Sequence, residues 1–371
     1  MLEFVIPCLL GLESLVGDEI KKLGLSDVRV ENGRVLCRGE ARDIARLNLN
    51  LRCGARVILV LHKFRATDFE SLFQGVRAVH WEDWIPREGE FPVVGYSINS
   101  TLHSVPACQS IVKKAVVDRL SAAYGIAQFP ETGRRYQVRF SIMKDEVTVG
   151  LDTSGEGLYK RGYRAQGVAP LKETLAAAMV KLSHYNGRDP FCDPFCGSGT
   201  IAIEAALIAR NRAPGLNRSF AAQHWATLDK MLWLDAADEA MDNEFHGKYE
   251  IWGGDIDPDA VELSRHNAEL AEVDDIVKFE VDDATRFHWG GLYGRIVTNP
   301  PYGERLLERE EAGELYKAFG KAMDKLPDTW RVYVLSSHSD FERCYGRFAD
   351  KKRKLYNGML KCDLFMYGKR L

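Results

Sequence analysis

The chain has 371 residues, and its 50 lysines and arginines against 53 aspartates and glutamates give a formal net charge of −3. At 46% hydrophobic and 28% charged, the composition is that of a folded globular protein and excludes a disordered or collagen-like chain. No apolar run approaches the roughly 20 residues that span a bilayer, so we expect no membrane partner. The length predicts two or three domains.

The eight cysteines lack the CxxC spacing of structural zinc sites, and the sequence contains no HExxH segment. The N-terminal segment has no basic region and runs directly into an amphipathic helix, unlike a signal peptide. We therefore expect a reduced, cytoplasmic protein without a metal site. Residues 1–165 are mildly basic and the remainder is acidic, which is weak evidence for a polyanion-facing module at the front. Nothing in the sequence indicates an oligomeric state.

The N-terminal half alternates strands and helices. Its first part has the βαββαβ order of a ferredoxin-like domain. The expected elements are strands at 2–8, 28–30, 35–38 and 56–62 and helices at 12–23 and 41–49. A second α/β unit follows, with helices at 68–76 and 108–124 and strands at 91–97, 136–144 and 146–152. The glycine-rich stretch that comes next reads as a linker.

The C-terminal half repeats strand then helix, which predicts a mostly parallel sheet with helices on both faces. The expected strands are 191–197, 250–257, 277–281, 295–299 and 331–336, with helices at 200–210, 259–272 and 313–326. Asn357-Gly358 is a strong hairpin signal, so the last strand should be antiparallel. The basic run 351–354 reads as a charged edge strand that resists aggregation, with phosphate contact as the alternative.

A glycine turn, DPFCGSGT at 193–200, joins the first of these strands to its helix. Gly197 and Gly199 allow a tight turn and a close approach to a ligand. The segment is neither a Walker loop nor GxGxxG, so alone it is compatible with a simple tight connection.

Acidic residues end the next two strands. Asp255 is placed to accept hydrogen bonds from ribose hydroxyls, whereas Asp257 fits the cap of the following helix. In the Asp282-Asp283-Ala284 segment we choose Asp283 as the residue that meets an adenine amino group. These assignments predict a nucleoside site at the carboxyl edge of the sheet.

The most specific motif is Asn299-Pro300-Pro301-Tyr302, where two prolines force the chain out of the sheet. The Asn299 side-chain oxygen and the Pro300 carbonyl can accept hydrogen bonds from one planar NH2 group, and Tyr302 can stack on its ring. This arrangement indicates chemistry on the exocyclic amine of a base.

These motifs in this order resemble the S-adenosylmethionine-dependent methyltransferases that modify exocyclic amines. Over nearly its whole length the chain resembles the THUMP-domain RNA guanine-N2 methyltransferases, of the bacterial 23S rRNA type. The segments that carry the resemblance are LEFVIPCLLGLESLVGDEIKKLG, SVPACQSIVKKAVVDRL, GLYKRGYRAQGVAPLKETLAAAMV and NPPYGERL. It implies a Rossmann-like class I methyltransferase domain at 171–371, preceded by an α+β region with a ferredoxin-like domain (1–63), a THUMP RNA-binding domain (64–155) and a linker (156–170).

The resemblance also implies roles by position. Catalysis falls to Asn299, Pro300, Pro301 and Tyr302. S-adenosyl-L-methionine would be held by Asp193, Phe195, Gly197, Ser198, Gly199, Thr200, Asp255, Ile256, Asp283 and Ala284, with Lys172, Glu173 and Thr174 closing the pocket. The partner would be RNA, with a 23S rRNA guanosine as the target.

RNA binding is predicted for basic residues of the N-terminal module, although a solvated helix face is the alternative for each. The residues are Lys113, Lys114, Arg119, Arg134 and Arg135, with Arg139 nearby. Rival functions are tRNA guanine-N2 methylation, adenine-N6 methylation of nucleic acid and glutamine-N5 methylation of protein. A binding-only protein with a degenerate catalytic domain is a further alternative, against which the intact motifs argue.

Overall fold

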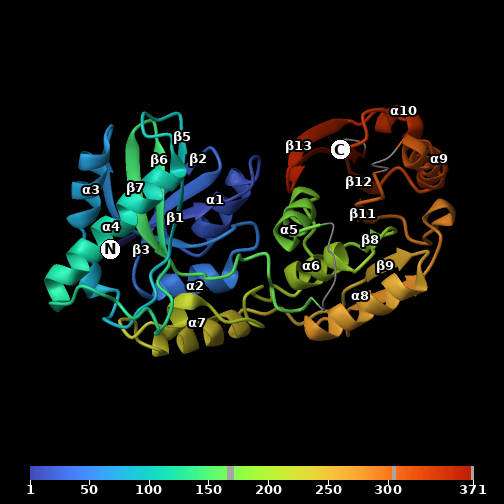
Figure 1. Ribbon diagram of the computed structural model, residues 1–371. Coiled ribbons are helices and arrows are strands. Elements are labelled where there is room, and N and C mark those ends of the chain that lie inside the picture. The colour runs from blue at the N-terminus through green and yellow to red at the C-terminus, as the bar shows by residue number, and fades with distance from the viewer. Residues whose placement is uncertain (165–170, 303–305, 369–371) are drawn as a thin grey trace. The chain divides into compact units, whose positions relative to one another are not determined.

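The computed structural model describes residues 1–164, 171–302 and 306–368, the side chains of 306–309 excepted, so part of the predicted linker lies outside the described residues. The chain forms two compact units (Figure 1). The N-terminal unit comprises Met1–Cys8, Val16–Leu158 and Ser219–Glu239, and the C-terminal unit comprises Leu9–Leu15, Tyr159–Arg218 and Ala240–Leu371.

The N-terminal unit is built on one seven-stranded sheet with the order β2-β3-β1-β4-β7-β6-β5. Its strands are β1 (Leu2–Pro7), β2 (Ser26–Glu31), β3 (Arg34–Gly39), β4 (Ile58–Arg65), β5 (Val93–Ile98), β6 (Val138–Met143) and β7 (Glu146–Asp152). Its helices are α1 (Glu13–Lys22), α2 (Arg42–Asn50), α3 (Phe69–Arg77) and α4 (Val105–Tyr124), with a 3-10 turn at Trp81–Asp83.

The two predicted front modules share this sheet, because β4 pairs with β7 in antiparallel register. Gly150 makes the close pairing possible, since a Cβ there would lie 2.0 Å from the Leu59 carbonyl oxygen. The predicted boundary at residue 63 therefore falls inside a continuous sheet. Helix α4 begins at Val105, three residues before its predicted start, with Pro106 in its first turn.

A segment from between the C-terminal strands, Ser219–Glu239, completes the N-terminal unit. The fully buried Trp225 stacks on Tyr136 at 5.1 Å between ring centroids, and its indole N–H donates to the Arg135 carbonyl at 3.1 Å. Arg46 of α2 forms an ion pair of 2.9 Å with Glu239. This segment carries most of helix α7 (Met231–Asp242), which was not predicted.

The C-terminal unit contains a second seven-stranded sheet, ordered β10-β9-β8-β11-β12-β14-β13. The first five strands in this order, from β10 through β9, β8 and β11 to β12, are parallel to one another. Strand β14 is antiparallel to β12, and β13 is antiparallel to β14. The strands are β8 (Phe191–Asp193), β9 (Ile251–Asp255), β10 (Val277–Val281), β11 (Arg295–Thr298), β12 (Arg331–Ser336), β13 (Lys351–Asn357) and β14 (Leu360–Tyr367). The helices are α5 (Glu173–Leu182), α6 (Thr200–Ala209), α8 (Pro258–Leu270), α9 (Leu306–Met323) and α10 (Phe341–Tyr345), with 3-10 turns at Ala284–Arg286 and, in the inserted segment, Ala221–His224.

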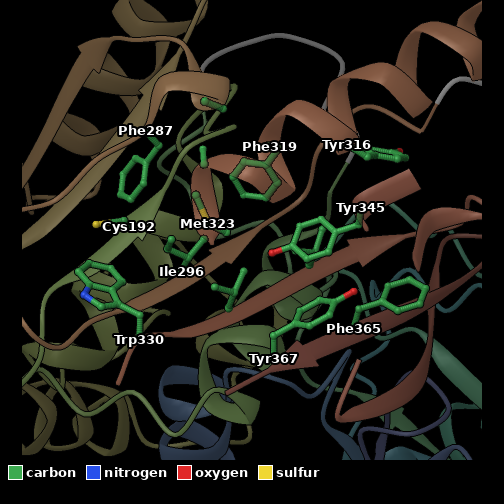
Figure 2. Packing of buried hydrophobic residues seen from close by; sticks show 14 of the residues in the cluster. Cys192, Phe287, Ile296, Tyr316, Phe319, Met323, Trp330, Tyr345, Phe365 and Tyr367 are labelled. Carbon is green, nitrogen blue, oxygen red and sulfur yellow. The ribbon is translucent and has the colours of Figure 1, made fainter. Parts of the chain in front are cut away.

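The predicted α/β architecture with a final antiparallel strand is confirmed. One face of the C-terminal sheet packs on an aromatic core, to which α9 contributes Tyr316 and Phe319 and α10 contributes Tyr345 (Figure 2). Strand β8 ends at Asp193, four residues before its predicted end, because the chain leaves the sheet before it reaches Gly197. Helix α9 starts at Leu306 rather than Gly313.

The C-terminal hairpin turns one residue later than Asn357-Gly358 suggests. Asn357 pairs with Leu360, so Gly358 and Met359 form the two-residue connection. Gly358 has φ +63° and Met359 does not have a positive φ, as a glycine-first hairpin turn requires. No helix within the described ranges is long and apolar enough to cross a membrane.

Candidate active site

A cavity of about 490 Å³ opens at the carboxyl edge of the C-terminal sheet, and three predicted motifs meet in it. Parallel α/β sheets bind ligands at this edge. Its predicted lining residues are Asp193, Phe195, Gly197, Ser198, Thr200, Asp255, Ile256, Asp283, Ala284, Asn299, Pro300, Pro301 and Tyr302. Five further residues to which the sequence assigned no role also line the cavity, namely Leu171, Pro194, Cys196, Ile201 and Leu315. Pro194 and Cys196 lie within the glycine-turn motif, whereas Leu171, Ile201 and Leu315 are apolar residues outside the motifs.

The glycine turn is shaped by its packing. Gly197 and Gly199 have φ of +52° and +80°, a region that L side chains rarely adopt. A Cβ on Gly199 would lie 2.9 Å from both Ser264 and Phe279, so this glycine lets the turn sit against α8 and β10. Nothing lies within 4 Å of a Cβ built on Gly197, which faces open space.

Asp193 is the electrostatic centre of the cavity. It is 1% exposed, and its Oδ1 accepts hydrogen bonds from the Thr298 hydroxyl at 2.6 Å and the Phe195 N–H at 3.3 Å. Its Oδ2 is buried and has no hydrogen-bond partner among the described residues. Burial raises the pKa of this carboxyl to about 7, against the effect of those two hydrogen bonds. A buried carboxylate oxygen without a donor is costly, so this site suits a ligand that carries a cationic N–H group.

The other acids at this edge of the sheet have partners within the chain. Asp255 accepts hydrogen bonds from the N–H groups of Gly197 at 2.9 Å and Asp257 at 3.1 Å, so it joins the glycine turn to β9. Asp257 caps α8 through Asp259 N–H, which confirms the capping role. A hydrogen bond from Thr285 lowers the pKa of Asp283, which keeps that carboxylate charged at the cavity wall.

The Asn299 motif follows β11 directly, one residue beyond the Thr298 that holds Asp193. The Tyr302 hydroxyl donates to Asn299 Oδ1, and Cys362 Sγ lies 3.9 Å from that hydroxyl. Burial raises the pKa of Tyr302, so the hydroxyl remains a donor at neutral pH. An amide oxygen has two lone pairs, so Asn299 retains acceptor capacity for a ligand amine. The Pro301 carbonyl accepts a hydrogen bond of 2.5 Å from the Tyr316 hydroxyl, which ties this turn to α9.

Four predicted cofactor residues do not line the cavity. Gly199 packs against Ser264 and Phe279, and Lys172 is at the N-cap position of α5, with its Nζ 4.8 Å from the Tyr159 ring centroid. Glu173 and Thr174 are buried in α5, where Glu173 pairs with Arg164 at 3.1 Å. Leu171 takes the place at the cavity wall that was assigned to these neighbours.

Arg164 links that helix to the cavity, because its guanidinium also donates to the Thr200 hydroxyl at 2.9 Å. A second ion pair behind it, between Arg161 and Glu204, is fully buried. Neither arginine was singled out from the sequence. The sequence signal that could have identified them is their position in the segment that precedes helix α5.

The predicted RNA-binding residues fall into two groups. Lys113 pairs with Glu131 at 2.7 Å and lies 3.6 Å from the Phe91 ring centroid, and Arg119 is paired with Glu82. Arg139 likewise pairs with the buried Asp152 at 2.8 Å. These three cations therefore have structural partners inside the N-terminal unit. The exposed residues are Lys114, Arg134 and Arg135.

Three domain families match the chain in order. They are the RlmL ferredoxin-like domain over 3–58, the THUMP domain over 66–152 and the RMKL-like methyltransferase domain over 161–365. YpsC of Bacillus subtilis (strain 168), provisionally named as an RNA methyltransferase, is 45% identical over 366 residues, covering 98% of this chain and 94% of its own. The chain belongs to the RMKL-like methyltransferase family.

Solved structures also resemble this RMKL-like methyltransferase along its whole length. SMU.472, solved in complex with SAH, is 42% identical with a TM-score of 0.92, covering 100% of this chain and 99% of its own. A Listeria monocytogenes (strain 4b F2365) protein, named as a predicted N6-adenine-specific DNA methylase, is 47% identical with a TM-score of 0.93, covering 99% and 96%. Among the described residues of this chain, no cluster of His, Cys, Asp or Glu is placed to hold a metal ion.

Proposed function

We propose that this RMKL-like methyltransferase transfers a methyl group from S-adenosyl-L-methionine to the exocyclic N2 of a guanosine in 23S rRNA. The observation that carries the proposal is the shared cavity of Asp193 and Asn299, where an unsatisfied buried carboxylate lies beside an acceptor for a planar amine. The THUMP domain match and the name of the YpsC relative support RNA as the substrate.

The cofactor fits the residues present. Its amino group would satisfy Asp193 Oδ2, its methionine part would lie on the Gly197 turn, and its nucleoside would meet Asp255 and Asp283. SAH in the SMU.472 structure supports this choice of ligand. When bound, the cofactor supplies an electrophilic methyl group. The chain then has to deliver a nucleophile in line, and such positioning can contribute about 7–11 kcal/mol to lowering a barrier.

Asn299 and the Pro300 carbonyl supply the nucleophile's orientation. The lone pair of the guanine amine is delocalised into the ring, so it is a weak nucleophile. Accepting both N–H groups returns electron density to nitrogen and aims the lone pair at the methyl group. The hydroxyl of Tyr302 holds the Asn299 oxygen, which makes Tyr302 a positioning residue. The nitrogen that accepts the methyl group becomes cationic and then releases one of its protons to solvent water.

The test uses RNA from a strain that lacks the gene. Purified protein and labelled S-adenosylmethionine are incubated with 23S rRNA and tRNA from that strain, and the products are digested to nucleosides. We expect labelled N2-methylguanosine from 23S rRNA. Label in tRNA alone would move the target to the tRNA alternative, and no label in any nucleic acid would overturn the proposal.

Adenine-N6 methylation is the second candidate, and the name of the Listeria relative favours it. An Asn-Pro-Pro-Tyr turn can accept any planar amine, so the motif does not separate adenine from guanine. The same digestion discriminates between them, because N6-methyladenosine or its deoxy form would appear in place of N2-methylguanosine when DNA is included.

A further inference from the structure

The tip of the β13–β14 hairpin stands at the same edge of the sheet as the active site. Strand β14 is antiparallel to β12, and Ser336, at the carboxyl end of β12, pairs with Asp363 near the start of β14. The hairpin connection, Gly358-Met359, therefore projects from the carboxyl edge. Cys362, two residues beyond Leu360 in β14, contacts the Tyr302 hydroxyl at 3.9 Å. The tip is thus anchored beside the Asn299 motif.

This tip carries apolar side chains without cover. Met359 is fully exposed, and Leu360 beside it is 39% exposed. A turn does not need methionine, since polar residues and glycine are the usual choice there. Its strands, in contrast, bury Leu355 and Cys362 in the ordinary way. The exposed methionine is therefore not explained by the packing of the hairpin.

The hairpin is also strongly basic. Lys351, Lys352, Arg353, Lys354 and Lys361 stand against one acid, Asp363. Lys352 pairs with Glu342 at 2.8 Å and Arg353 donates to the Gly11 carbonyl, whereas Lys354 and Lys361 are exposed and form no ion pair in the part of the chain that the structure describes. An apolar tip flanked by free cations fits a nucleic acid, with bases at the tip and phosphates at the lysines.

We propose that Met359 is a wedge that inserts into the RNA base stack next to the target nucleotide. This inference rests on the proposed function. A base that enters the cavity has to leave its stack, and an apolar side chain that fills the vacated space favours that state. Methionine is suited to the role because its flexible, polarisable side chain adapts to irregular surfaces.

The chain offers a matched control in Phe348. This residue is also a large exposed apolar side chain, at 82%. It precedes β13, whose first residue Lys351 pairs with Met366 at the end of β14, so it belongs to the opposite edge of the sheet. Phe348→Ser removes exposed apolar surface as Met359→Ser does, but away from the active site.

The experiment compares two synthetic RNAs that span the mapped target, one annealed to a complementary strand and one with the target nucleotide unpaired. We expect Met359→Ser to lower kcat/KM about tenfold on the paired RNA and less than about twofold on the unpaired RNA. Met359→Leu should retain activity on both, and Phe348→Ser should match wild type. SAH affinity should be unchanged in Met359→Ser, and Met359→Asn, which suits a turn, gives a second test should the serine variant fold poorly.

Equal losses on the two RNAs, or no loss on either, would overturn the wedge while leaving the proposed function intact. Loss in Phe348→Ser as large as in Met359→Ser would overturn it as well, since any exposed apolar residue would then serve. Absence of methylation by the wild-type protein on both RNAs would instead overturn the proposed function, and the wedge with it.

Discussion

Two groups of charged side chains were predicted to bind ligands, and their surroundings differ. In the candidate active-site cavity of the C-terminal unit, Asp193 is buried and one of its oxygens has no hydrogen-bond partner among the described residues. On helix α4 of the N-terminal unit, Lys113 and Arg119 are held by Glu131 and Glu82. A buried charged group without a partner costs free energy that a ligand can offset, whereas a charged group that is already paired within the protein needs no ligand. The comparison favours the cavity over the α4 face as a site whose ligand the chain is built to receive.

Asn299→Ala gives the sharpest test of the cavity side. Removing the amine acceptor should lower kcat by about 10²–10³-fold, the usual effect of losing one preorganised hydrogen bond in an active site. SAH affinity should stay at the wild-type value, because Asn299 is assigned to the base rather than to the cofactor. Labelled methyl incorporation into RNA and a binding titration measure the two quantities. Turnover at the wild-type rate in a folded variant would refute the assigned role.

Asp193→Asn should weaken SAH binding by about 10- to 100-fold, since it replaces a charge-assisted hydrogen bond with a neutral one. Wild-type affinity should increase from pH 6 to 7.5, because ligand binding requires the ionised carboxylate and its pKa is about 7. The variant should lose this pH dependence. An identical pH profile in both proteins would assign the titration to another group.

The same carboxyl has the opposite effect on folding. Its pKa is raised from 3.8 in the unfolded chain to about 7 in the folded protein, so the folded state retains a proton within that window. Stability should therefore fall as pH rises from about 4 to 7 and change little through this group above that. Thermal unfolding of wild type relative to Asp193→Asn across this range measures the effect, and a difference independent of pH would contradict it.

Arg134 and Arg135 test the other side of the comparison. Replacing both exposed residues by Ala should lower RNA affinity about tenfold. The slope of log affinity against log salt concentration should also become shallower, by the amount expected for the loss of about two phosphate contacts. Lys114→Ala should have a smaller effect of the same kind. Filter binding at several salt concentrations gives both quantities, and unchanged affinity would remove these residues from the RNA-binding surface.

Lys113→Ala has the smallest expected effect, and it is on stability. Loss of its half-exposed ion pair with Glu131 and of its contact with the Phe91 ring should cost about 1 kcal/mol. RNA affinity should change less than in the Arg134/Arg135 variant. Denaturant unfolding and the same binding assay separate the two outcomes, and an affinity loss without destabilisation would return Lys113 to the binding surface.

Motif order and strand periodicity predicted the architecture and most of the cavity, because strand ends in an α/β sheet converge on one edge. What they missed depends on long-range contacts. The pairing of β4 with β7 depends on contacts between segments that the sequence separates widely, so it left no local signal that the front modules share a sheet. The Tyr302–Asn299 hydrogen bond and the pairing of Lys113 depend on side-chain directions that spacing does not determine.

The inserted segment Ser219–Glu239 has a consequence for dissecting this protein. Trp225 belongs in sequence to the C-terminal half, yet its stacking partner Tyr136 and its acceptor, the Arg135 carbonyl, come from the front. A C-terminal fragment that begins after Leu158 would expose this indole to water and would lack the acceptor of its N–H hydrogen bond. Division of the chain at one point does not separate the two units, because their segments alternate along the chain. The C-terminal unit therefore cannot be exchanged between relatives as one continuous segment.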